Sequence, residues 1–227
     1  MHRLAGTMIR PVIAAAICAS IAVSTGLAQV APPKIIILVG PPGSGKTTQA
    51  KLLAKKYDIP AFSMADLLKK EMARKKDAVS KGLAAAIASG EVLPDDAATD
   101  LIRLRLLRTD LRKGFILDGY PATAGQAKSL DRMLQDQQLP RAVVVVLDAP
   151  DDVIRKRMIA RGRADDKPEI IDRRIQEFRK EAALLAGWAG QTSVVRVNAN
   201  TGIGDVTTQI VSGLEGTWSK QNSEQRP

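Results

Sequence analysis

A short glycine-rich stretch is the part of this sequence best suited to chemistry. It reads GPPGSGKTTQA, and Gly40, Gly45, Lys46 and Thr47 fit the pattern G-x-x-x-x-G-K-[ST]. Glycines in such a loop let backbone N–H groups converge on phosphate oxygens, the lysine supplies charge at the terminal phosphates, and a hydroxyl can ligate Mg²⁺. A helix that begins at the loop adds its dipole. The loop therefore predicts a phosphate-binding site.

An aspartate at the end of a buried strand is a candidate partner of this loop. Asp118 closes the apolar run GFILD, at the edge where ligand crevices of parallel sheets open. It could hold Mg²⁺ through water. The alternative is an aspartate that caps the next segment.

Four arginines further along the chain form a third candidate group. Arg157 and Arg161 are four residues apart and share a helix face, Arg163 follows, and Arg174 lies one helix later. Arginines in such a pattern can form a solvated, salt-bridged face. Beside a phosphate loop, four planar donors also suit a clamp on a polyphosphate.

Alternating strands and helices must position these residues. KIIILVG (34–40), IPAFSM (59–64), GFILDG (114–119), AVVVVLD (142–148) and SVVRVNA (193–199) are strand candidates, and helical segments separate them. This order predicts a five-stranded parallel sheet flanked by helices, an α/β fold of the P-loop class. Residues 65–113 form a helical excursion, and 149–178 hold two helices broken at 162–167. The polar tail 216–227 is expected to be disordered.

The first residues have the layout of a secretory signal. Basic MHRLAGTMIR precedes an apolar run and small residues, and cleavage is expected after Ala28. An uncleaved anchor is an alternative, since 12–31 is uncharged and near the ~20 residues that span a bilayer. A lipid anchor on Cys18 and a misassigned start codon are further alternatives. The protein is expected to be exported if the signal is used, and cytoplasmic otherwise.

Composition narrows the chemistry of the mature chain. Removing residues 1–28 takes away two arginines, the one histidine and the one cysteine, and leaves a net charge of +8. Disulfides, cysteine nucleophiles and a histidine base are then excluded. A basic surplus suits nucleic acid, anionic membrane or a phosphorylated small molecule, and aromatic residues at 3% argue against a base-stacking surface. These features suit phosphoryl transfer to an acceptor that is itself a phosphate. The second pKa of such a phosphate is about 6, so the acceptor is already ionised at neutral pH and no general base is required.

With these motifs in order, the sequence resembles the adenylate kinases and related nucleoside-monophosphate kinases of the short-lid type over about 35–214. The matching segments are GPPGSGKTTQA, SMADLLKKEM, SGEVLPDD, GFILDGYPATAGQ and ARGRADDKPEIIDRRI. The resemblance implies a core (34–215) that binds ATP and Mg²⁺, a monophosphate-binding segment (62–95) and a short lid (161–168) that excludes water. It also implies nucleotides as partners and a monomer, with no nucleic acid.

The resemblance assigns roles to individual residues. Donor phosphates and Mg²⁺ would be held by Gly40, Gly43, Ser44, Gly45, Lys46, Thr47 and Thr48, with Asp118 on the metal through water. Arg157 and Arg161 would contact ATP, and Arg163 and Arg174 would lie between the two phosphates. The acceptor would be bound by Asp66, Lys69, Glu91, Val92, Leu93, Gly119, Tyr120 and Gln126.

Several positions depart from the family pattern. Thr47 stands where the family usually has glycine, and Ser63 to Asp66 read Ser-Met-Ala-Asp in place of Ser-Thr-Gly-Asp. Lys69 and Ala122 replace two arginines that grip the acceptor phosphate. A hydrogen bond to a charged group contributes roughly 1.5–3 kcal/mol, so these changes favour weaker acceptor capture.

The leading hypothesis is therefore a kinase that moves the γ-phosphoryl group of ATP to AMP or another nucleoside monophosphate. A nucleotide-binding protein of the same fold with weak or no turnover is the alternative. A simple ATPase is a third hypothesis, and the two helical excursions argue against it.

Overall fold

A computed structural model describes residues 32–74, 93–107, 109–163, 165–189 and 193–224. The strands are β1 (Lys34–Val39), β2 (Ala61–Ser63), β3 (Gly114–Asp118), β4 (Val143–Asp148) and β5 (Ser193–Asn198). The helices are α1 (Lys46–Tyr57), α2 (Met64–Arg74), α4 (Asp95–Leu106), α5 (Ala124–Asp136), α6 (Asp151–Arg161), α7 (Pro168–Ala189) and α8 (Ile203–Glu224). No helix within these ranges is long and apolar enough to cross a membrane.

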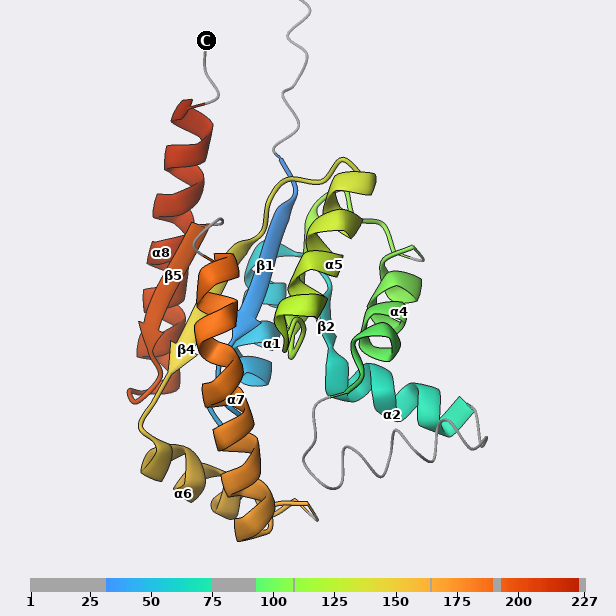
Figure 1. The fold of residues 1–227 in the computed structure, drawn as a ribbon. Coiled ribbons are helices and arrows are strands. Elements are labelled where there is room, and N and C mark those ends of the chain that lie inside the picture. The colour runs from blue at the N-terminus through green and yellow to red at the C-terminus, as the bar shows by residue number, and fades with distance from the viewer. Residues whose placement is uncertain (1–31, 75–92, 108, 164, 190–192, 225–227) are drawn as a thin grey trace, which may run out of the picture. The chain divides into compact units, whose positions relative to one another are not determined.

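The five strands form one parallel sheet in the order β2-β3-β1-β4-β5 (Figure 1). The expected α/β fold and all five strand candidates are confirmed. Because β1 lies at the centre, with β3 on one side and β4 on the other, the loop that follows it emerges at the middle of the sheet's carboxyl edge. This is where parallel sheets place their ligands.

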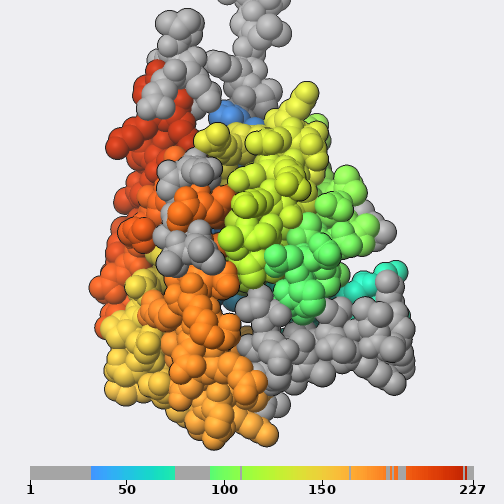
Figure 2. Space-filling view, viewed as in Figure 1, coloured from blue at the N-terminus to red at the C-terminus, as the bar shows by residue number. Residues whose placement is uncertain are grey.

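Successive residues of β1 face opposite sides of the sheet, which explains its unbroken apolar run. Ile35 and Ile37 belong to the core under α4, α5 and the end of α7. Ile36 and Leu38 belong to the core under α1, α6 and α8. A strand buried on both faces has no polar side to alternate with. Helices α5 and α7 both pack on the first of these faces and lie next to each other on the surface (Figure 2). Trp188 Nε1 joins them by donating to Asp131 Oδ2 at 2.7 Å.

Both helical excursions are confirmed where the structure describes them. The first contains α2 and α4, with no strand in its described residues, and 75–92 lie outside the description. The second contains α6, which ends at Gly162 in a left-handed conformation (φ 64°), and α7, which begins at Pro168. Proline suits the first turn of a helix because its missing N–H has no intrahelical partner there.

The prediction of a disordered tail at 216–227 is wrong as far as Glu224, where α8 ends. The polar composition of this stretch hides an aromatic contact. Trp218 packs edge-to-face on Tyr57 with ring centroids 5.2 Å apart, and the ammonium of Lys34 lies 5.4 Å from the Trp218 ring. Gln221 Nε2 also donates to Ser193 Oγ at 3.1 Å. These contacts tie the last turns of α8 to the sheet.

Candidate active site

The phosphate loop follows β1 and lies tightly against neighbouring elements. Gly43 and Gly45 have φ of 82° and 95°, which only glycine adopts readily. A Cβ atom on Gly43 would lie 2.9 Å from Met158 Cγ of α6, and one on Gly40 would collide with the carbonyl oxygen of Leu147 in β4. The close packing therefore requires glycine at 40 and 43.

Polar groups around the loop are arranged for an anionic ligand. The residue that caps α1 is Gly45, which has no side chain. The cap residue therefore does not cover the first N–H groups of the helix. Ser44 is 2% exposed, and its Oγ has no hydrogen-bond partner among the described residues. An unpaired buried hydroxyl is costly unless a ligand satisfies it.

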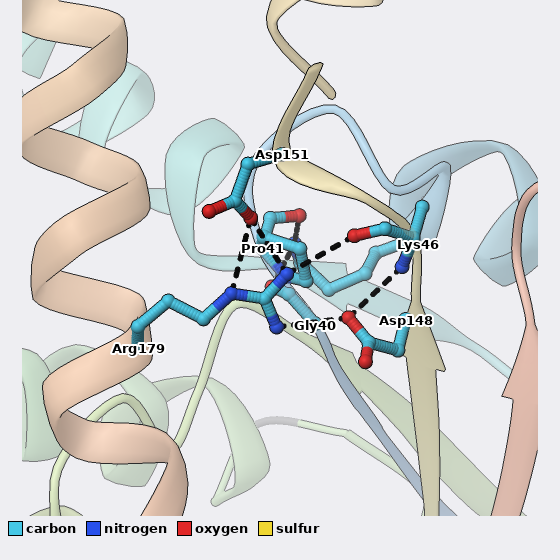
Figure 3. Close-up of polar contacts among 7 residues, drawn as sticks. Gly40, Pro41, Lys46, Asp148, Asp151 and Arg179 are labelled. Carbon is cyan, nitrogen blue, oxygen red and sulfur yellow. Dashed lines mark hydrogen bonds and ion pairs between the residues drawn. The ribbon is translucent and has the colours of Figure 1, made fainter. Parts of the chain in front are cut away.

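Lys46 folds back over the loop. Its Nζ donates to the carbonyl oxygens of Gly40 at 2.6 Å and Pro41 at 2.8 Å (Figure 3). Burial lowers the pKa of Lys46 to about 8; the negative charge of Asp118 raises this pKa and the positive charge of Arg161 lowers it. The lysine is thus a cation whose charge is incompletely compensated within the protein.

Thr47 and Asp118 meet beside this lysine. Thr47 Oγ1 donates to Asp118 Oδ2 at 2.6 Å, and Asp118 is 5% exposed. A hydroxyl and a carboxylate at hydrogen-bond distance are oxygen donors of the type that Mg²⁺ uses, with one or two protein ligands and the rest supplied by phosphates and water. The pair therefore fits the predicted metal position.

Three of the four arginines are held by a neighbouring acceptor. Arg157 Nη1 donates to the Ala199 carbonyl at 2.8 Å. Arg161 donates from Nε and Nη2 to the two oxygens of Asp166, at 2.9 and 2.6 Å, and these hydrogen bonds lower the pKa of Asp166. Arg174 Nη2 donates to Asp165 Oδ2 at 2.6 Å. These acceptors fix the guanidinium groups in defined positions.

A cavity of about 610 Å³ brings many of the predicted residues together. Its lining includes the following predicted residues: Gly40, Lys46, Lys69, Leu93, Gly119, Gln126, Arg163 and Arg174. Ala122 and Met64 line it too, and α7 contributes Phe178 and Leu185. The cavity is therefore lined by basic side chains as well as by apolar ones.

Other predicted residues lie elsewhere. Tyr120 does not line the cavity: it is fully buried, and its hydroxyl bonds Thr99 at 3.0 Å and donates to the Gln126 carbonyl at 3.1 Å. Its ring belongs to the core under α4 and α5. Asp66 is exposed on α2 and absent from the lining. Glu91 and Val92 lie outside the described residues. The remaining predicted residues do not line the cavity: Gly43, Ser44, Gly45, Thr47, Thr48, Asp118, Arg157 and Arg161.

A polar network that sequence reasoning missed holds Gln126 in place. Gln126 Oε1 accepts from Ala122 N at 2.8 Å, and its Nε2 donates to Asp95 Oδ1 at 3.1 Å. Thr123 Oγ1 also donates to Asp95 Oδ1, at 2.7 Å, and accepts from Gln126 N at 3.1 Å. The spacing Thr-x-x-Gln at 123–126 matches the capping pattern of a helix start and could have revealed this part of the network.

A substitution at Gly125 tests how much this network contributes to the stability of the protein. A Cβ atom there would collide with Asp95 Oδ2, so we expect Gly125→Ala to displace the carboxylate from its two donors. Two lost hydrogen bonds to a carboxylate, of about 1.5 kcal/mol each, less a gain of up to about 1 kcal/mol in helix propensity, lower the free energy of unfolding by about 2 kcal/mol. Urea titration measures this. Gly216→Ala in α8 meets nothing within 4 Å and should instead stabilise the protein; equal effects at both glycines would contradict the expectation.

Comparison with known proteins places this site in a family. The family model described as adenylate kinase matches residues 38–193. The chain is 37% identical over 182 residues to adenylate kinase 1 of Nostoc sp. strain PCC 7120, with 79% of this chain and 97% of that protein covered. It is 38% identical over 187 residues to adenylate kinase of Bifidobacterium longum, with 79% and 99% covered, and 35% identical over 188 residues to that of Leptospira biflexa, with 80% and 100% covered. The chain therefore belongs to the adenylate kinase family.

Proposed function

We propose that this protein transfers the γ-phosphoryl group of ATP to AMP and so forms two ADP. The observation that carries the proposal is the cavity in which Lys46 of the phosphate loop shares one space with Lys69, Arg163 and Arg174. Phosphoryl transfer needs two phosphate groups aligned and their charge neutralised, and cations from both sides of one cavity supply this. The names of the relatives favour a kinase over a protein that only binds nucleotide.

The residues around the loop bind the donor, hold the metal ion, or lie between the two substrates. Lys46 and the N–H groups of the loop bind the donor phosphates, and Arg157 and Arg161 bind the donor from α6. Thr47 and Asp118 would hold Mg²⁺, directly or through water; bound Mg²⁺ supplies charge neutralisation on the phosphates. Arg163 and Arg174 lie where the transferred group passes between donor and acceptor.

The acceptor side has fewer positive charges than the donor side. Lys69 of α2 reaches the cavity as a single point charge, and Ala122 contributes only a methyl group. Leu93, Gly119 and Gln126 line the end in which the acceptor base would lie. The acceptor phosphate is already ionised near neutral pH, so its oxygen attacks without a general base.

A coupled assay of the purified chain tests the proposal. With ATP, AMP and Mg²⁺, we expect ADP to form in a two-to-one ratio to the ATP consumed. ATP binding in calorimetry without ADP formation would leave only the nucleotide-binding alternative. Release of inorganic phosphate without AMP would indicate an ATPase.

The charge state of Lys46 predicts a pH dependence of ATP binding. Its pKa of about 8 lies below the usual 10.5, so the free protein loses this charge as the pH rises through about 8. Bound polyphosphate favours the charged form, so ATP binding should raise the pKa and take up about half a proton at a pH equal to the pKa of the free protein. At higher pH the affinity for ATP should fall. Calorimetry in buffers of different ionisation enthalpy measures the uptake, and Lys46→Met should abolish it; uptake that persists in that variant would assign it to another group.

We also propose that the protein is exported. The basic start, the apolar run and the small residues up to Ala28 support this proposal. N-terminal sequencing of the protein from the cell envelope tests it. A chain that begins at Gln29 indicates a cleaved signal, an intact start in the membrane fraction indicates an anchor, and an intact start in the cytoplasm contradicts export.

A further inference from the structure

Helices α6 and α7 are joined side by side and, with the loop between them, carry all four arginines of the predicted phosphate clamp. We call these two helices and the loop the arginine arm. Ion pairs join its parts: Asp151 with Arg179, Arg155 with Asp172, and Arg161 with Asp166. The first two pairs have opposite polarity, with the acid on α6 in one and on α7 in the other.

Arg179 differs from Arg155 and Arg161 because it also binds the end of a strand of the sheet. Its Nη1 donates to Asp148 Oδ1 at 2.9 Å, and its Nη2 donates to the Ala149 carbonyl at 3.0 Å and to Asp151 Oδ1 at 2.7 Å (Figure 3). Asp148 is the last residue of β4, and Asp151 is the first of α6. One planar guanidinium thus joins α7, α6 and the end of a central strand.

The end of β4 that Arg179 grips also supports the phosphate loop. Leu147 places its carbonyl oxygen against Gly40, where a Cβ atom would collide with it. The carbonyl oxygen of the next residue, Asp148, accepts from Ala199 N at 2.7 Å, and the Ala199 carbonyl in turn accepts from Arg157. The turn 147–151 therefore connects the phosphate loop, the support of Arg157 and the arm.

Because Arg179 lies on the same helix as Arg174, its contacts can affect the side chains that line the cavity. Arg174 lies five residues earlier on the same helix, about 7.5 Å along its axis, and lines the cavity with Arg163. A tilt of α7 at Arg179 would move both guanidinium groups relative to Lys46. Displacements of about 1 Å at a reacting centre can cost about 100-fold in rate.

We propose that Arg179 is a positioning residue that fixes the arginine arm against the end of β4 and thereby sets the distance between its arginines and the phosphate loop. This inference rests on the proposed function. Arg179 does not line the cavity, so it acts through Arg157, Arg163 and Arg174.

A matched pair of variants tests the inference in the full chain. Arg155 makes a pair with Asp172, at 2.8 and 2.6 Å, that joins α6 to α7 without reaching β4. Both pairs are partly exposed, so Arg179→Ala and Arg155→Ala should lower the thermal midpoint by a similar, small amount. We expect Arg179→Ala to lower kcat about tenfold, Arg179→Lys to recover part of this loss, and Arg155→Ala to stay within about twofold of the parent.

Binding gives a readout that does not depend on turnover. Calorimetry should show the Kd for ATP raised about fivefold or more in Arg179→Ala, with the Kd for adenosine unchanged, because only phosphate contacts are displaced. If Arg179→Ala matches Arg155→Ala in both kcat and Kd for ATP, the inference is overturned. A parent protein that binds ATP but forms no ADP would overturn the proposed function, and the binding comparison would still decide the role of Arg179.

Discussion

Replacing Lys46 with methionine is expected to lower kcat for phosphoryl transfer about 100- to 1,000-fold, the loss typical of removing one preorganised group from developing negative charge. Lys46 Nζ is held by the Gly40 and Pro41 carbonyls, 2.6 and 2.8 Å away, and the residue lines the cavity. A phosphate in the loop would offer this ammonium a charged acceptor in place of two neutral ones. Methionine retains most of the length of the side chain and loses the charge. Steady-state kinetics with ATP and AMP measure the effect.

Stability should distinguish this effect from misfolding. The lowered pKa of Lys46 shows that its charge is unfavourable in the folded protein at neutral pH. Removing it relieves that cost and offsets the two lost hydrogen bonds, so the thermal midpoint should change little. Lys51→Met is the matched control, since Lys51 lies exposed on the same helix. A kcat within about tenfold of the parent in Lys46→Met would contradict the role given to this lysine.

Placing an arginine at the acceptor side is expected to increase activity, whereas Lys46→Met is expected to decrease it. Ala122→Arg should raise kcat/KM for AMP about 10- to 100-fold, because a charge-assisted hydrogen bond contributes about 1.5–3 kcal/mol. Ala122 lines the cavity, and its backbone N–H is fixed by Gln126 at 2.8 Å, so a longer side chain would start from a defined position. The effect should appear in kcat/KM for AMP and leave the KM for ATP unchanged.

Ala124→Arg is the control for the added charge. It places the same side chain two residues away, at the start of α5 and off the cavity lining. We expect its kinetics to stay within about twofold of the parent. If Ala122→Arg behaves like this control, the methyl group at 122 does not limit acceptor capture, and another acceptor class becomes the better explanation.

Local patterns in the sequence predicted the framework and the donor side of the site. The apolar runs of β1, β3 and β4 are continuous because these strands are buried on both faces, and such runs are readable without a structure. The glycine spacing of 40–47 is equally local, since backbone conformation and close packing require it. Asp118 was predicted from its position at the end of a strand, and the structure places it against Thr47.

The tertiary structure alone decided which charged and aromatic side chains meet. Tyr120 belongs to a motif that resembles an acceptor site, yet its ring is in the core. Trp218 lies in a polar stretch, yet it packs on Tyr57 in a helix that continues to Glu224. Arg179 is one of many charges on α7, and its grip on Asp148 and Asp151 depends on where two helices pass the end of β4. Periodicity and spacing report the burial of a segment and its local conformation; partners brought together from distant parts of the chain leave no such trace, because their meeting depends on how whole elements pack.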